Sequence, residues 1–246
     1  HDVEQVLIGS MLGDGCIGCY PKYRDAWFTE SKKIEHIDYL GWKAKILSEF
    51  GGSIREREGE SGLPHLGSRQ FKAAVFRTFV HPLFTQLRHI WYPNGKKVVP
   101  EGELQKLDEL GLAVWYMDDG SYGVLTRSCL ISTGSFTLDE QILTKDAFKE
   151  KWGLIPKIIP AGKGYGLDFL VSDTDKLLRV MAPFIHPDMV YKLGHIHPDN
   201  LGRINQMRRA YLERRRQREK ERYHSDSTYR EHILEHNRKC REEVRS

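Results

Sequence analysis

The chain has 246 residues, of which 39% are hydrophobic and 29% are charged. These proportions are typical of a globular protein with one or two domains. The sequence also argues against a membrane-spanning protein, because no apolar run approaches the roughly 20 residues that a spanning helix needs. The first residues lead directly into a motif without a secretion signal. We therefore expect an intracellular protein, cytoplasmic or organellar.

The net charge of +4 is distributed unevenly along the chain. Residues 203–246 carry a net charge of +6, whereas the first 202 residues carry −2. The overall charge therefore does not predict nucleic-acid binding by itself, and such a prediction depends on where the basic residues lie.

The four cysteines, at positions 16, 19, 129 and 240, are too few for a disulfide framework in a chain of this length. Cys16 and Cys19 have the spacing of half a zinc site, but the sequence offers only His195 and His197 as a weak second pair. We expect reduced thiols with a structural role.

In the first half, the hydrophobic periodicity predicts a helix that ends at Gly13-Asp14-Gly15, followed by an extended segment around 26–29. A second helix is predicted over about 33–50, where Gly51-Gly52 ends it. Turn-rich sequence predicts a hairpin over 53–70. Further helical segments are expected near 71–80 and 82–90.

The second half repeats this order. We expect a helix from about 103 to 118–120, a strand over 129–133, a helix after Thr137, a hairpin over 155–172 and a helix over 174–185. Pro93–Pro100 reads as the linker between the halves. The predicted organisation is a first half over 1–98, a second half over 99–202, and a charged helical tail over 203–246.

Two apolar, helix-length runs each end with an aspartate followed by a glycine. They are Leu7–Gly15, with the sequence LIGSMLGDG, and Leu112–Gly120, with the sequence LAVWYMDDG. Asp14 and Asp119 are 105 residues apart, and the same offset separates the His-Pro pairs at 81–82 and 186–187. Several matches in the same order indicate a tandem duplication.

The two aspartates would converge if the motif helices packed side by side with their C-terminal ends together. Gly9, Ser10 and Ala113 are small enough to allow that approach. Helix C-termini carry negative partial charge and free carbonyl groups, so they favour a cation. Oxygen ligands suit Mg²⁺, with Mn²⁺ or Ca²⁺ as substitutes. One Asp-Gly would be only a helix stop, but two in a duplicated context predict a metal site.

At these motifs the chain resembles the LAGLIDADG homing endonucleases, in their single-chain branch with two motifs. The resemblance covers most of residues 3–195 and includes the basic segments around Asn94–Pro100 and Met189–Leu193. It implies an α+β fold of two pseudosymmetric αββαββα units, each presenting a curved antiparallel sheet to the DNA major groove. It also implies a monomer that cleaves both strands of a long, roughly pseudopalindromic DNA site with divalent metal.

The resemblance assigns site roles to six residues: Asp14 and Asp119 as metal-binding catalytic acids, Gly13 and Asp118 as sources of further metal-binding oxygens, and Lys97 and Lys192 as catalytic lysines near the scissile phosphates. Asp118 could instead be only a polar residue at a helix end, and Lys96 competes with Lys97. The third and fourth motif positions differ between the copies, which predicts an asymmetric helix interface.

Basic residues on the predicted hairpins and turns are the candidate DNA contacts, because Arg and Lys suit guanine edges and phosphates. They are Lys22, Arg24, Arg55, Arg57, Arg69, Arg127, Lys157 and Lys163. The charged tail has two interpretations, a solvated helix with i,i+4 ion pairs or an arm that contacts phosphates.

The leading hypothesis is a metal-dependent, site-specific DNA endonuclease. One alternative is an intron RNA maturase on the same fold, which would have RNA as a partner, and another is a non-catalytic DNA-binding protein. Paired acids argue against a purely binding role, because binding does not need them. An endonuclease domain within an intein also remains open.

Overall fold

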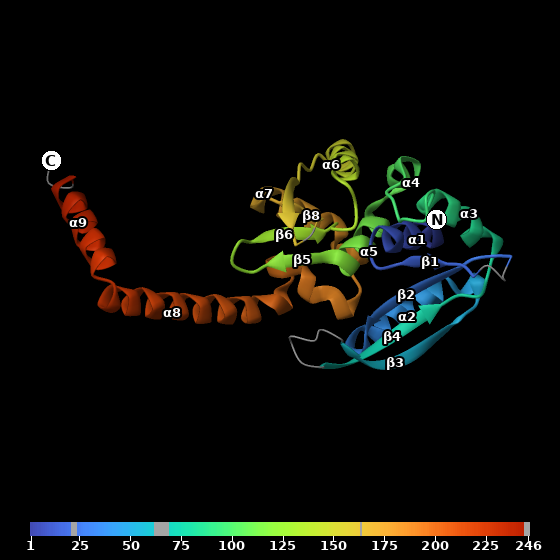
Figure 1. Cartoon of the computed structure of the whole chain (residues 1–246), viewed down its shortest axis with the longest axis horizontal. Helices are drawn as coiled ribbons and strands as arrows, with labels where there is room; N and C mark the ends of the chain where they lie inside the picture. The colour runs from blue at the N-terminus through green and yellow to red at the C-terminus, as the bar shows by residue number, and fades with distance from the viewer. Residues whose placement is uncertain (21–23, 62–68, 163, 244–246) are drawn as a thin grey trace. The chain divides into compact units, whose positions relative to one another are not determined.

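The order α-β-β-α-β-β-α occurs twice along the chain (Figure 1). The computed structural model describes residues 1–20, 24–61, 69–162 and 164–243. The first repeat consists of α1 (Asp2–Leu12), β1 (Cys16–Gly18), β2 (Trp27–Lys33), α2 (Ile37–Ile46), β3 (Ser53–Ser61), β4 (Arg69–Arg77) and α3 (Pro82–Trp91). The second consists of α5 (Glu109–Asp119), β5 (Gly120–Gly123), β6 (Ser128–Ser132), α6 (Leu138–Trp152), β7 (Lys157–Ala161), β8 (Gly164–Phe169) and α7 (Val171–Met181). This confirms the predicted α+β class with two αββαββα units.

Each repeat forms one four-stranded antiparallel sheet. The strand order is β1-β2-β4-β3 in the first sheet and β5-β6-β8-β7 in the second. Phe28 and Phe76 of the first sheet, and Ile131 and Phe169 of the second, are buried in the hydrophobic core. Each sheet therefore has one face packed against the helices, as an antiparallel sheet with alternating burial usually does.

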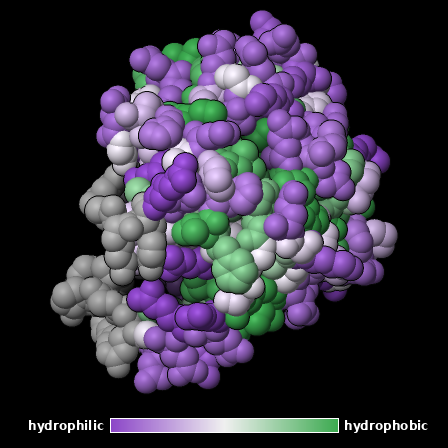
Figure 2. Space-filling model, turned by 90° about the vertical axis from the view of Figure 1, so that its right-hand side faces the viewer, coloured by the Kyte–Doolittle hydropathy of each residue, from purple (hydrophilic) through white to green (hydrophobic). Residues whose placement is uncertain are grey.

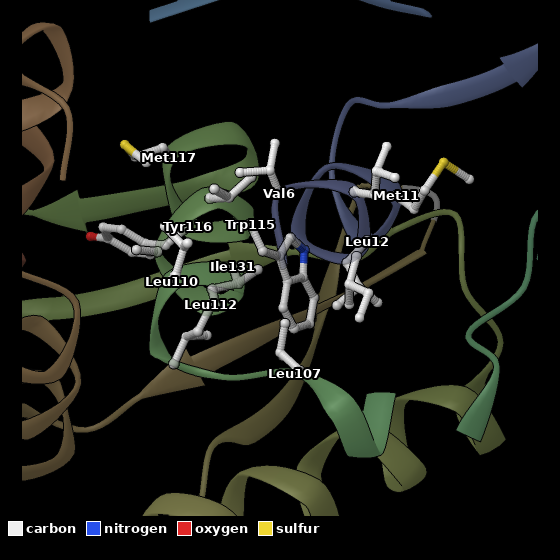
Figure 3. Packing of buried hydrophobic residues seen from close by; sticks show 14 of the residues in the cluster. Val6, Met11, Leu12, Leu107, Leu110, Leu112, Trp115, Tyr116, Met117 and Ile131 are labelled. Carbon is white, nitrogen blue, oxygen red and sulfur yellow. The ribbon is translucent and has the colours of Figure 1, made fainter. Parts of the chain in front are cut away.

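The two repeats are joined through α1 and α5, which pack side by side (Figure 3). A Cβ atom at Gly9 would lie 2.3 Å from the carbonyl oxygen of Gly111, so only glycine permits this approach. The predicted asymmetry of the interface is present. Ser10 hydrogen-bonds to Lys43, whereas the equivalent Trp115 directs its indole toward Leu12 and packs against Phe148.

Polar contacts also cross between the repeats. The side chain of Gln5 in α1 donates to the carbonyl of Lys106 and accepts from the backbone N–H of Asp108, each at 2.9 Å. The backbone N–H of Val99 donates to Glu140 at 2.8 Å. Residues 1–200 consequently form one unit.

The helix predicted near 71–80 is wrong, because those residues belong mainly to β4. Their apolar side chains are nearly consecutive in the sequence, which hides the period of two. In the structure Ala74 and Phe76 face the core, whereas Arg77 points outward.

The helix predicted from about 103 is divided into α4 (Glu101–Lys106) and α5. Asp108 ends the continuity, because its side chain accepts from the backbone N–H of Gly111 and begins a new helix.

The tail forms a second unit over residues 201–246 with α8 (Leu201–Ser225) and α9 (Ser227–Glu243). It is helical and charged as predicted, with i,i+4 ion pairs such as Arg215–Glu219 at 2.8 Å.

Figure 2 shows a mainly hydrophilic surface with hydrophobic residues gathered near the middle of this side of the molecule. Within the described residues, the helices are all too short or too polar to cross a membrane.

Candidate active site

The C-terminal ends of α1 and α5 lie together, which places the two motif aspartates at one site. A Cβ atom at Gly13 would be 2.7 Å from Cβ of Asp118, so the two helix ends touch. Asp14 follows α1 and its side chain is 42% exposed, whereas Asp119 is the last residue of α5 and is half-buried. The convergence expected from the duplicated sequence therefore occurs.

The Asp119 carboxyl group lies in a negative environment. Burial, together with the nearby charges of Asp14 and Asp118, raises its pKa to about 7. Among the described residues it has no salt-bridge partner, whereas Asp14 is paired with Lys32. A cation between the two acids would relieve this repulsion.

Lys97 and Lys192 occupy corresponding places beside the two helix ends. The ammonium group of Lys97 donates to the carbonyl oxygens of Gly13 and Gly15, both at 2.8 Å. That of Lys192 donates to Met117 at 2.5 Å and to Asp118 at 3.3 Å. Each lysine thus satisfies carbonyls left free at the end of its motif helix. Lys96 is exposed, so Lys97 is the lysine that reaches the site.

Burial shifts both of these lysines toward the neutral form. It lowers the pKa of Lys97, and it lowers the pKa of Lys192 to about 8. Lys192 is only 8% exposed. It lies in a helical segment that is capped by His186 and interrupted at Gly194, whose φ is 54°. A lysine with a lowered pKa exchanges protons more easily near neutrality than an ordinary surface lysine.

The Asp118 side chain does not point toward solvent beside Asp119. Its carboxylate is fully buried and accepts hydrogen bonds from Lys32 at 2.5 Å, from Lys43 at 2.8 Å and from the Tyr39 hydroxyl at 3.0 Å. Burial alone would raise the pKa of Asp118, but the two ammonium groups hold it below its usual range. Only the backbone carbonyl of Asp118 faces the Lys192 side of the site.

Sequence reasoning missed the buried cluster formed by Glu30, Lys32, Lys43 and Asp118. Lys43 is fully buried and bridges Glu30 at 2.7 Å and Asp118 at 2.8 Å. Lys32 bridges Asp118 and Asp14, with its ammonium group 2.6 Å from Asp14 Oδ2. The available signal was positional. Phe28, Glu30 and Lys32 are two residues apart and therefore lie on the same buried face of β2. Lys43 lies on the same buried side of its helix as Leu40 and Leu47.

The candidate DNA contacts are dispersed over the sheets and loops. Arg55 and Arg57 are exposed on β3, Lys157 is exposed on β7, and Arg127 is exposed in the β5–β6 turn with a φ of 55°. Arg24 is exposed in the segment before β2. Lys22 and Lys163 lie outside the described residues, as does the side chain of Arg69. Lys33 and Arg77, which the sequence reasoning did not select, lie on the same face of the first sheet as Arg55 and Arg57.

The donor set at the helix ends fits a hard divalent cation. Asp14 and Asp119 supply carboxylate oxygens, and the helix ends add the carbonyls of Gly13 and Asp118. Burial, together with the charges of Asp14 and Asp118, raises the pKa of Asp119, so a cation at this point would favour its ionised form. The described residues contain no group of three or more His, Cys, Asp or Glu side chains suited to a metal. A cation would therefore rely on the two motif acids, on carbonyls and on oxygens from water or substrate.

The chain belongs to the LAGLIDADG DNA endonuclease family, whose sequence model matches residues 4–177. The fold resembles that of the homing endonuclease I-WcaI bound to its DNA recognition sequence, with a TM-score of 0.68 and 23% identity. That similarity covers 78% of this chain and 86% of the other.

Curated relatives carry several names. "Probable intron-encoded DNA endonuclease 3" of Mycosarcoma maydis is 33% identical over 129 residues, which is 50% of this chain and 95% of the relative. "Cytochrome b mRNA maturase bI2" of Debaryomyces hansenii is 27% identical over 202 residues, covering 79% of this chain and 74% of the relative. "Protein RecA" of Mycobacterium shimoidei is 29% identical over 207 residues, covering 77% of this chain but only 45% of the relative. The chain thus spans less than half the length of this RecA relative.

Proposed function

We propose that the protein is a site-specific DNA endonuclease that hydrolyses phosphodiester bonds in both strands of a roughly pseudopalindromic target and acts as a monomer. The observation that carries this proposal is the juxtaposition of Asp14 and Asp119 at two touching helix ends, each with a lysine that donates to the neighbouring carbonyls. A duplicated site of this kind matches the near-twofold symmetry of duplex DNA.

The chemistry we infer divides between the acids and the lysines. Asp14 and Asp119 would hold Mg²⁺, with Mn²⁺ or Ca²⁺ as substitutes in binding, and a bound cation activates water and stabilises the leaving oxygen. Lys97 and Lys192 would place positive charge beside the two scissile phosphates and orient the attacking water. The site lies within residues 1–200, so a single chain carries both halves.

A second candidate function is RNA maturation, with RNA as the partner. It is favoured by the relative from Debaryomyces hansenii, which is named as an mRNA maturase and matches along 79% of this chain. A maturase that acts by binding RNA would not need the paired acids, whereas the proposed endonuclease would need them to hold its metal. The same acid variants therefore separate the two functions.

The test is a cleavage selection on a randomised duplex library with Mg²⁺, which would identify the target. On that target, we expect Asp14→Asn and Asp119→Asn each to abolish double-strand cleavage while binding in a gel-shift assay persists. Asp139→Asn on α6 is the matched control, because that acid is exposed and belongs to neither motif. Full cleavage by both motif variants would refute the site assignment.

A further inference from the structure

The strand register assigns the described strand residues to two faces of each sheet, because side chains opposite each other in antiparallel strands point the same way. In the first sheet, Phe28, Phe76 and Ile54 lie on the face that packs against the core. The opposite face, called the first open face, has as its described strand residues Cys16, Gly18, Trp27, Thr29, Ser31, Lys33, Ser53, Arg55, Arg57, Gly59, Phe71, Ala73, Val75 and Arg77.

The first open face is strongly basic. Lys33, Arg55, Arg57 and Arg77 contribute four cations, and these fourteen described residues include no carboxylate. The acids of the same strands, Glu30, Glu56 and Glu58, occupy the alternate positions and so point to the other face. The alternation therefore gives the first open face a more positive charge than the sequence of these strands, read as a whole, carries.

The corresponding open face of the second sheet has a different composition. Its described strand residues are Ser121, Gly123, Ser128, Leu130, Ser132, Lys157, Ile159, Ala161, Gly164, Gly166 and Asp168. Lys157 is their only cation, and it pairs directly across the strands with Asp168. The charges of this second open face therefore balance, and its other side chains are small or apolar.

The first open face also contains a hollow of about 620 Å³. Arg55, Val75 and Arg77 line it from the strands, and Phe79 closes it from the following loop with a side chain that is 69% exposed. The guanidinium group of Arg77 lies 3.9 Å from the ring centroid of Trp27. Stacking restrains that guanidinium group, which reduces the entropy lost when it binds a partner.

We propose that the two halves of the DNA target are read by different chemistry. The half that contacts the first open face is recognised through guanidinium and ammonium contacts to guanine edges and phosphates. The half that contacts the second open face is recognised through apolar contacts to thymine methyl groups and through the close approach that its glycines allow. This inference rests on the proposed function, because it assumes that the open faces bind the target.

The chemistry of base edges supports this division. Arg and Lys donate to O6 and N7 of guanine in the major groove, whereas apolar side chains discriminate the thymine methyl group. Leu130, Ile159 and Ala161 offer apolar side chains, and Asp168 has Lys157 directly opposite. The target is then asymmetric, with a guanine-containing half and an A·T-rich half. Binding of the first half depends more strongly on salt, because its contacts release counterions.

The experiment is a binding selection with the full chain and a randomised duplex library in Ca²⁺, followed by sequencing of the retained DNA. We expect one half of the selected site to be enriched in guanine and the other in A·T pairs. Recovery of no specific duplex would overturn the proposed function and this inference together. A specific site whose halves have equal composition would overturn this inference alone.

Variants then assign each half to its sheet. Arg55→Gln with Arg77→Gln should relax the guanine preference by roughly 5- to 150-fold per contact and reduce the salt dependence of binding. The matched change on the second open face, Ile159→Ala, should relax only the A·T-rich half and leave the salt dependence unchanged. The inference is overturned if either variant relaxes both halves equally. Melting curves of both variants establish that they fold.

Discussion

The ammonium group of Lys32 lies 2.6 Å from Oδ2 of Asp14, so the acid of the first motif is already paired with a cation from the protein. The same ammonium group lies 2.5 Å from Asp118. Asp119 has no such partner among the described residues. The duplication thus produces two chemically unequal acids, one balanced by a lysine and one with its pKa raised to about 7 by burial and by neighbouring acids.

We expect Lys32→Met to destabilise the metal-free protein, because it leaves the buried Asp118 and Glu30 with Lys43 as their remaining ammonium partner. Removing one partner from a buried ion pair costs about 3–5 kcal/mol. Urea unfolding without metal measures this loss of free energy. Because a bound cation stabilises the folded state, added Ca²⁺ should recover more stability in the variant than in the wild type.

The control for this change is Lys33→Met, the adjacent lysine on the opposite face of the same strand, which is exposed. It should leave the unfolding free energy nearly unchanged. Equal stability of the Lys32 and Lys33 variants would contradict the role given to Lys32.

We expect Lys43 and Glu30 to be energetically coupled, because both side chains are fully buried and lie 2.7 Å apart. Lys43→Met alone should cost about 3–5 kcal/mol, since it leaves two buried carboxylates short of a partner. Adding Glu30→Gln should then cost less than it does in the wild-type background. A double-mutant cycle in urea should give a coupling energy of about 0.5–3 kcal/mol.

The exposed pair Lys72–Glu58 at 2.6 Å is the comparison and should show much weaker coupling. Strict additivity at Lys43 and Glu30 would refute the prediction.

We expect Lys97→Met to reduce DNA cleavage by about 100-fold or more, by analogy with the loss of a positioned electrostatic donor. Its ammonium group contacts the carbonyls on both sides of Asp14, whereas the adjacent Lys96 is exposed. Single-turnover cleavage of the selected target measures the effect. Lys96→Met is the matched control and should change cleavage far less. Similar rates for the two variants would show that Lys97 has no special position.

The sequence predicted the elements whose signals are local. The helices before Asp14 and Asp119 have apolar periodicity and a following glycine, and both form as expected. The helix after Thr137 forms with a capping box in which Thr137 and Glu140 bond to each other's backbone. The second hairpin, with strands Lys157–Ala161 and Gly164–Phe169, also lies within its predicted range.

The buried charges could not be predicted in the same way, because they depend on contacts between distant segments. Lys32 and Asp118 are 86 residues apart, and only the packing of α1, α2, β2 and α5 brings their side chains together. In sequence each is an ordinary charged residue, and such residues are mostly exposed. The prediction of a helix near 71–80, where β4 forms, was wrong for a related reason, since consecutive apolar residues do not distinguish a strand from a helix.

We expect Gly9→Ala to lower the free energy of unfolding, although alanine is normally the better helix former. The new Cβ would lie 2.3 Å from the carbonyl oxygen of Gly111 and 2.8 Å from Cβ of Val114, so α1 and α5 would have to separate. Overpacking of this kind typically costs about 1–3 kcal/mol. The matched control is Gly41→Ala in α2, where a new Cβ meets nothing within 4 Å and helix propensity should stabilise the protein by up to about 1 kcal/mol. Thermal and urea unfolding of both variants should therefore shift in opposite directions, and a stabilising Gly9→Ala would contradict the close helix contact. Because Gly13 and Asp118 meet at the end of the same interface, Gly9→Ala should also slow cleavage by displacing Asp14 relative to Asp119.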